Sequence, residues 1–235
     1  MSEFLFTFVA RKPFGQMTKR LLIRLIVALG TIATLCQTAS AQTFRVGLRD
    51  GFSLSWLVGI DDTLPQASFY AGITGDCYFG DRLGVGLDVT LAEQGALCNE
   101  NSEGVITDYS FHYLNIPLMA HYRLPIGAEQ FLQFSAGGQV GIFLSASCDY
   151  TAPSVLGDGC VSGSERLDSD SFHPTDFGVV AAVEFGTGNT SIEVRYALGI
   201  TQTHNGISNT LNGNYYISVP DNRNSVLQIG TIIRF

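Results

Sequence analysis

The chain has 235 residues, of which 14% are charged and 46% hydrophobic, and its formal net charge is −8. Such a length suits one domain or two small ones. An acidic chain offers few cationic contacts to phosphate, so the composition argues against a nucleic-acid partner.

The first part of the chain predicts a secretory signal peptide. A basic segment from Met17 to Arg24 precedes an apolar run of 11 residues, Leu25 to Leu35, and a polar stretch then ends in Ala39-Ser40-Ala41. This order of basic start, short apolar core and small-residue end is that of a cleaved export signal. The alternative is a membrane anchor, which requires about 20 apolar residues. We therefore expect a signal peptide over residues 1–41, with a possible start at Met17, and an exported domain over residues 42–235.

Removal of this segment changes the charge balance of the chain. The exported domain keeps 8 basic residues, all arginine, against 20 acidic residues, which gives a formal charge of −12. That balance further disfavours nucleic acid. The domain has no second long apolar run, so we expect no helix that spans a bilayer.

Apolar residues recur with period two from Thr43 onward, which is typical of β-strands. Eight such segments are expected near 44–58, 67–79, 83–94, 109–124, 130–147, 175–186, 190–204 and 224–235. Short connections alternate with long ones that are rich in Gly, Ser, Asn and Asp, near 59–66, 95–108, 148–174 and 205–223. This alternation is typical of an outer-membrane barrel with short periplasmic turns and long extracellular loops.

The two faces of these segments differ in polarity. One face carries Gln, Ser, Glu, Arg and many Gly, whereas the other is almost entirely aliphatic or aromatic. Eight strands leave an interior just wide enough for side chains, and lipid requires an apolar exterior. We therefore expect an all-β, eight-stranded antiparallel transmembrane β-barrel in the outer membrane. A soluble barrel is the alternative that strand periodicity alone does not exclude.

Two positions conflict with regular strands. Asp50 would fall on the lipid face if alternation ran unbroken from Val46 to Phe52, so we expect a bulge near Arg49-Asp50-Gly51 that re-aims it. Pro117 has no N–H to donate to a ladder, so a local irregularity is expected there.

The segment Tyr113-Leu114-Asn115-Ile116-Pro117-Leu118-Met119-Ala120-His121-Tyr122-Arg123 resembles the Tyr-Leu-x-Ile-Pro-Leu strand of the PorT-like outer-membrane β-barrel family of Bacteroidetes-type bacteria. The glycine-bearing first strand at 44–53, the segment 83–95 and the aromatic end at Phe235 are similar to that family as well. The resemblance covers nearly the whole exported domain, and its most specific part is Ile116-Pro117-Leu118. It implies an outer-membrane location and a barrel of about this size, but no single activity.

Charged residues on the polar face are candidates for a network inside the barrel. They are Arg45, Asp88, Glu184, Glu193, Arg195 and Arg234. Opposite charges in a narrow interior can pair and plug the bore, or they can line a narrow polar conduit. Because small barrels are usually filled by side chains, we favour the plug.

The exported domain has four cysteines, and an oxidising compartment permits disulfides. Cys148 and Cys160 flank one loop segment, so we expect them to pair. Cys98 could compete, and the pairing of Cys77 and Cys98 is left open. A zinc site lacks the usual Cys-x-x-Cys spacing, so no metal is expected.

No catalytic motif stands out. The histidines, His112, His121, His173 and His204, show no His-x-x-x-His or Glu-x-x-His spacing. His121 is expected in the lumen in a structural role. A Ser–His hydrolase would require a serine, a histidine and an acid that converge in space, with His204 as the candidate. No cofactor is expected.

The leading hypothesis is a non-enzymatic outer-membrane barrel that displays extracellular loops for adhesion, assembly or partner recognition. The alternatives are a narrow solute pore and a surface lipid or ester hydrolase. The expected partners are outer-membrane lipid and a surface or periplasmic protein.

Overall fold

The computed structural model describes residues 42–58, 63–100, 105–153, 160–167, 172–203, 207–211, 215–219 and 223–235. The chain divides into two compact units, Met1–Phe44 and Arg45–Phe235, and the barrel described below is formed by the second. The expected signal peptide, residues 1–41, lies outside the described residues. Among the residues that are described, no helix is long and apolar enough to cross a membrane.

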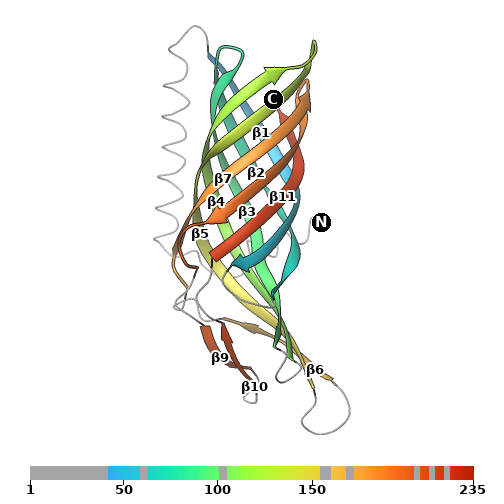
Figure 1. Cartoon of the computed structure of the whole chain (residues 1–235), viewed down its shortest axis with the longest axis vertical. Coiled ribbons are helices and arrows are strands. Elements are labelled where there is room, and N and C mark those ends of the chain that lie inside the picture. The colour runs from blue at the N-terminus through green and yellow to red at the C-terminus, as the bar shows by residue number, and fades with distance from the viewer. Residues whose placement is uncertain are drawn as a thin grey trace. The chain divides into compact units, whose positions relative to one another are not determined.

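Eight strands form a closed antiparallel ring. β1 pairs with β2 on one side and with β11 on the other, and the ring continues through β3, β4, β5, β7 and β8 (Figure 1). β6 pairs with β5 outside the ring, and β9 and β10 form a separate hairpin. The predicted eight-stranded antiparallel barrel is confirmed. The strands are β1 (Gln42–Val58), β2 (Thr63–Phe79), β3 (Leu83–Glu100), β4 (Val105–Pro125), β5 (Gln130–Pro153), β6 (Cys160–Arg166), β7 (Thr175–Thr187), β8 (Thr190–Gly199), β9 (Ile207–Leu211), β10 (Tyr215–Val219) and β11 (Arg223–Arg234).

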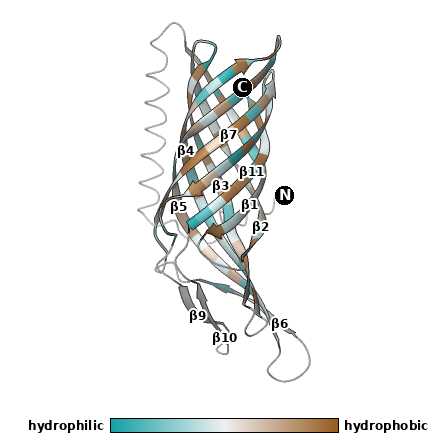
Figure 2. Ribbon diagram, viewed as in Figure 1, coloured by the Kyte–Doolittle hydropathy of each residue, from teal (hydrophilic) through white to brown (hydrophobic). Residues whose placement is uncertain are grey.

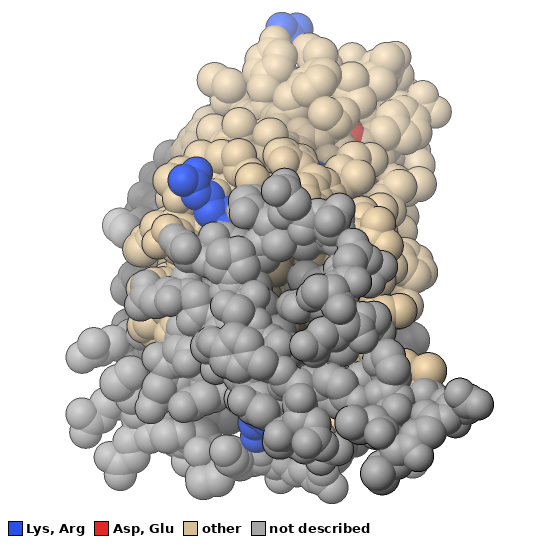
Figure 3. All heavy atoms as spheres, turned by 60° about the horizontal axis from the view of Figure 1, so that its bottom comes forward, with Lys and Arg blue, Asp and Glu red and all other residues tan. Residues whose placement is uncertain are grey.

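Alternation along each strand determines which way the barrel faces. In β8, Glu193 and Arg195 are buried while Ile192, Val194 and Tyr196 are exposed. Hydropathy likewise alternates along the strands in Figure 2. The described part of the wall that faces the viewer in Figure 3 carries few charged atoms. Polar residues therefore fill the inside and apolar residues cover the outside, which is the arrangement of a membrane barrel.

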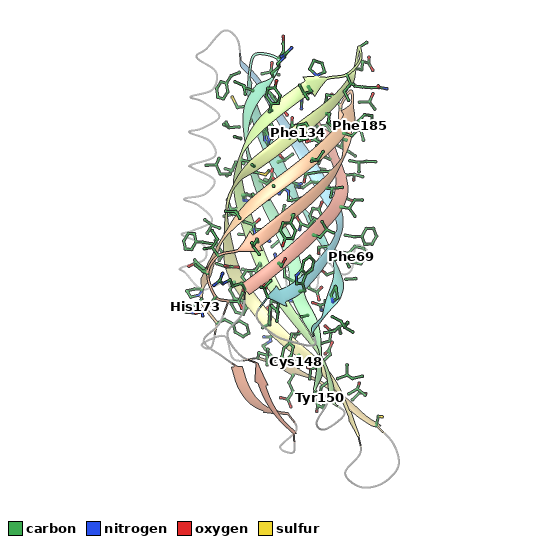
Figure 4. All side chains as sticks on the ribbon, in the orientation of Figure 1. Phe69, Phe134, Cys148, Tyr150, His173 and Phe185 are labelled. Carbon is green, nitrogen blue, oxygen red and sulfur yellow. The ribbon has the colours of Figure 1, made fainter. Side chains whose placement is uncertain are left out.

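The outer surface has an apolar band that ends toward the long connections. Outward side chains are apolar up to Leu91 in β3, Leu114 in β4 and Ile142 in β5, and polar side chains such as Glu93 and His112 begin beyond this level. Aromatic side chains lie near both edges of the band: Phe134 and Phe185 toward the short turns, and Phe69 toward the long connections (Figure 4). Such rings favour the two membrane interfaces.

The predicted loops at 95–108 and 148–174 are partly strand. β3, β4 and β5 continue past the apolar band, and β5 also pairs with β6 there. The prediction was wrong about these ends because it treated Gly, Ser, Asn and Asp as loop residues. Outside lipid a strand can present polar residues on its outer face, so composition no longer distinguishes strand from loop.

The expected bulge at Arg49-Asp50-Gly51 is absent from the described strand. β1 pairs with β11 in one unbroken register from Gly47, opposite Arg234, to Val58, opposite Arg223. Asp50 therefore points outward and is exposed. The irregularity expected at Pro117 is present, because the β3–β4 pairs stop at Leu87–Leu118 and resume at Thr90–Asn115.

Candidate functional site

The lumen near the short turns holds a cluster of charges around Arg234. Its Nε donates to Asp76 Oδ2 at 2.7 Å, and its Nη1 and Nη2 donate to Glu184 at 2.5 and 2.9 Å. His121 lies between Asp76 Oδ1, 3.3 Å from Nε2, and Ser135 Oγ, 2.8 Å from Nδ1. All five side chains are buried. We call Asp76, His121, Ser135, Glu184 and Arg234 the turn-side cluster.

Arg123 lies beside this cluster at the turn-side opening. Its guanidinium carbon lies 4.1 Å from the centre of the Tyr78 ring and 3.9 Å from that of the Phe131 ring. Its Nε also donates to Gln133 Oε1, and Gln133 donates in turn to Glu184. A guanidinium between two rings combines cation–π attraction with close packing. These side chains narrow the bore on the periplasmic side.

A second cluster of charges lies deeper in the barrel. Arg49 donates to Asp88 and to Glu193, and Arg195 donates to the same two carboxylates at 2.7 and 2.9 Å. Each of the four side chains is at most 3% exposed. We call Arg49, Asp88, Glu193 and Arg195 the central cluster. Its two positive and two negative charges balance, as buried charges require.

Apolar side chains lie further along the barrel, between the charges and the long connections. Met119, Val180, Ala197 and Val226 form one buried cluster. A larger one, at the long-loop end, contains stacked Phe143 and Phe172 rings 4.5 Å apart, together with Tyr109, Phe111 and Tyr113. The described lumen therefore contains both ion pairs and apolar layers along its length.

The structure brings five of the six predicted lumen residues into these two clusters. Asp88, Glu193 and Arg195 lie in the central cluster, and Glu184 and Arg234 lie in the turn-side cluster. Arg45 is only half-buried and contributes to neither cluster. The sequence reasoning missed Arg49 and Asp76. Arg49 shares its strand face with Arg45, so alternation through β1 would have identified it if no bulge had been expected.

Polar side chains form a network outside the apolar band, on β2, β3 and β4. Gln66 Nε2 donates to Asp108 Oδ1 at 2.6 Å and to Ser110 Oγ at 2.9 Å, and Ser110 donates to Glu93 Oε1. Asp149 lies directly opposite Asp108 on β5. Burial, and then the negative charges of Asp149 and Glu93, raise the pKa of Asp108. A groove of about 400 Å³ adjoins this pair, lined among others by Ile106, Tyr150 and Ser162.

The predicted disulfide between Cys148 and Cys160 is wrong. Cys148 lies opposite Glu165, whereas Cys160 lies opposite Pro153, five positions further along β5. That offset separates the two Cα atoms by about 16 Å along the sheet, and a disulfide spans at most about 7 Å. Cys148 is buried and Cys160 is exposed, while the side chain of Cys98 lies outside the described part of the chain.

A histidine, a serine and an acid do meet in the structure, but not at the predicted place. His204 lies outside the described residues, whereas in the lumen His121 is hydrogen-bonded to Ser135 and lies 3.3 Å from Asp76. These side chains are at most 5% exposed, and Arg234 also holds Asp76. A serine nucleophile must reach its substrate, so this burial favours the structural role predicted for His121. Among the described residues no group of acidic, histidine or cysteine side chains is arranged to hold a metal ion.

A comparison with protein families agrees with this architecture. Residues 37–205 match the family described as outer membrane protein beta-barrel domain. No curated protein is significantly similar to the chain. Among solved structures, OprG from Pseudomonas aeruginosa is 16% identical, with a TM-score of 0.46 over 83% of this chain and 97% of its own. Ail from Yersinia pestis is 15% identical, with a TM-score of 0.41 over 81% and 98%. Neisserial surface protein A is 13% identical, with a TM-score of 0.40 over 83% and 99%.

Proposed function

Because the chain belongs to the outer membrane protein β-barrel domain family, we propose that it is a non-enzymatic outer-membrane barrel that displays its extracellular strands and loops to a partner. This display would serve adhesion, assembly or partner recognition. The supporting observation is that β3, β4 and β5 continue past the apolar band and carry β6 with them. Cys148 and Tyr150 mark this extension in Figure 4.

The exposed side chain of Cys160 allows a test of whether β6 lies on the extracellular side of the membrane. Cys160 lies on β6 and is exposed, whereas Cys77 and Cys148 are buried. In a Cys98→Ser background, a membrane-impermeant maleimide should therefore label intact cells at Cys160, and a further Cys160→Ser change should remove that label. Labelling of Cys160 only after cell lysis would place β6 in the periplasm and contradict the proposed role.

The runner-up is a narrow solute pore, and the filled lumen argues against it. The central cluster and the buried cluster of Met119, Val180, Ala197 and Val226 lie inside the described ring, and the cluster that contains Tyr109, Phe111 and Tyr113 lies at its long-loop end. The purified protein should therefore show no stepwise conductance in a planar bilayer at neutral pH. Steady open-channel steps in the wild type that vanish on heat denaturation would favour the pore instead.

Two further features of the chain support finer proposals. The basic, apolar and small-residue segments before Gln42 support export through a cleaved signal peptide with mature residues 42–235. The Ile116-Pro117-Leu118 strand supports a place within the PorT-like branch of outer-membrane barrels.

We also propose that the lumen ion pairs have a structural role in closing the bore.

A further inference from the structure

Asp50 occupies an unusual place on the barrel wall. It points outward from β1, and its outward neighbours on β1 and β11, Leu48, Phe52, Ile229 and Ile233, are apolar and 47 to 59% exposed. Within the apolar band, no other charged side chain of the described strands faces outward. Ionisable groups that face lipid are costly and mark functional positions by default.

The interior of the barrel holds Asp50 in this position. Arg49, one residue before, is fixed in the lumen by Asp88 and Glu193. Gly51, one residue after, lies opposite Gly230, and a Cβ on Gly230 would come within 2.2 Å of Tyr70 Oη. If Asp50 pointed inward, its neighbour Arg49 would point outward and lose its ion pairs. The Asp50 side chain would also have to enter the tightly packed space beside Gly51 and Gly230. The outward position therefore results from the packing on both sides of Asp50.

The hydrogen bonding of Asp50 within the chain is incomplete. Thr231 lies directly opposite on β11, and its hydroxyl donates to Asp50 Oδ1. A carboxylate offers about four acceptor positions, and lipid supplies no water to fill the others. A group from another molecule that carries hydrogen-bond donors and a positive charge would therefore complete the hydrogen bonding of the Asp50 carboxylate.

A second copy of the chain does not provide that group. The described arginines either lie in the lumen, as Arg49, Arg123, Arg195 and Arg234 do, or lie outside the band, as Arg82, Arg166 and Arg223 do. Arg45 lies at the periplasmic end of β1. Two copies that met through this face would place two carboxylates together with no cation between them.

We infer that the outward face around Asp50 and Thr231 is a lateral interface for another membrane-embedded protein, which presents a lysine or arginine at the depth of Asp50. The apolar neighbours supply the surrounding contact area, and the charge selects the partner. This inference does not depend on the extracellular display proposed above.

Site-specific photocrosslinking in intact outer membranes tests this interface. A benzophenone side chain replaces Leu48, the outward neighbour of Asp50. At the control position it replaces Leu118, a similarly exposed residue of β4 on the far side of the ring. Each variant is made with Asp50 and with Asp50→Asn. Folding of all four is checked by heat-modifiable gel mobility. Adducts are identified by mass spectrometry.

The expected result is one protein adduct at position 48 that is absent at position 118. Because it would lose a charge-assisted hydrogen bond, Asp50→Asn should weaken this adduct at least about tenfold. Replacing a basic residue in the spanning segment of the captured protein should have the same effect. An adduct that is unchanged by Asp50→Asn would overturn the inference, as would one equally strong at position 118, one to a second copy, or one to lipid alone.

Discussion

Replacing Val194 with arginine is expected to abolish efficient folding into lipid vesicles. Val194 faces outward from the middle of β8 and is 46% exposed, between the buried Glu193 and Arg195. An arginine at this place would have to enter hydrocarbon, which costs about 2–4 kcal/mol near the bilayer midplane. A loss of this size is a large fraction of the stability of an ordinary domain.

Heat-modifiable gel mobility after refolding into vesicles measures this effect. Val194→Ala is the matched control, because it removes apolar area without adding charge, and it should fold nearly as well as the wild type. If Val194→Arg folded with the yield of Val194→Ala, then the outer surface of β8 would not be in contact with lipid.

Replacing Arg49 with methionine should destabilise the barrel by about 3–5 kcal/mol, the usual cost of removing one partner from a buried ion pair. Arg49 donates to both Asp88 and Glu193. Its loss would leave two buried carboxylates with Arg195 as their remaining partner in the central cluster. Methionine keeps most of the apolar volume, so the effect reports on charge.

Urea unfolding in detergent or thin-lipid vesicles gives the free-energy difference. Arg223→Met is the control, because Arg223 is exposed at the start of β11 and should change stability little. Adding Glu193→Gln to Arg49→Met should restore part of the lost stability, since it removes one of the uncompensated charges. Equal stability of Arg49→Met and the wild type would show that the central cluster contributes no net stabilisation.

The ring and its orientation could be predicted because period two in a strand directly separates the two faces. Glu193, Arg195 and Arg234 were assigned to the lumen by this alternation alone, and the structure buries all three. The short turns were equally visible, and Gly80 and Gly188 adopt positive φ angles of 73° and 57° there, a conformation that glycine tolerates best.

Other features depend on which strands become neighbours, and alternation does not contain that information. Asp76 joins Arg234 across 158 positions of sequence, a contact that only ring closure creates. The Cys148–Cys160 pairing failed for a related reason, because closeness in sequence says nothing about register when both residues lie in paired strands. Asp50 was misjudged because the rule that charges avoid lipid was given more weight than the unbroken alternation of β1.

The unequal strand lengths have a consequence for how a bound object would sit on the cell. β5 leaves the ring after Ile142, where its pairing with β7 ends, and continues to Pro153 between β4 and β6. At ~3.3 Å per residue, the stretch from Ser145 to Pro153 extends about 30 Å along the strand. β7 and β8 have no such extension, because they begin at Thr175 and end at Gly199. The extracellular rim is therefore higher along β4 and β5 than along β7 and β8, so a ligand held by the extended wall would contact one side of the barrel, and the rotation of the barrel in the membrane plane would determine the direction in which that side faces.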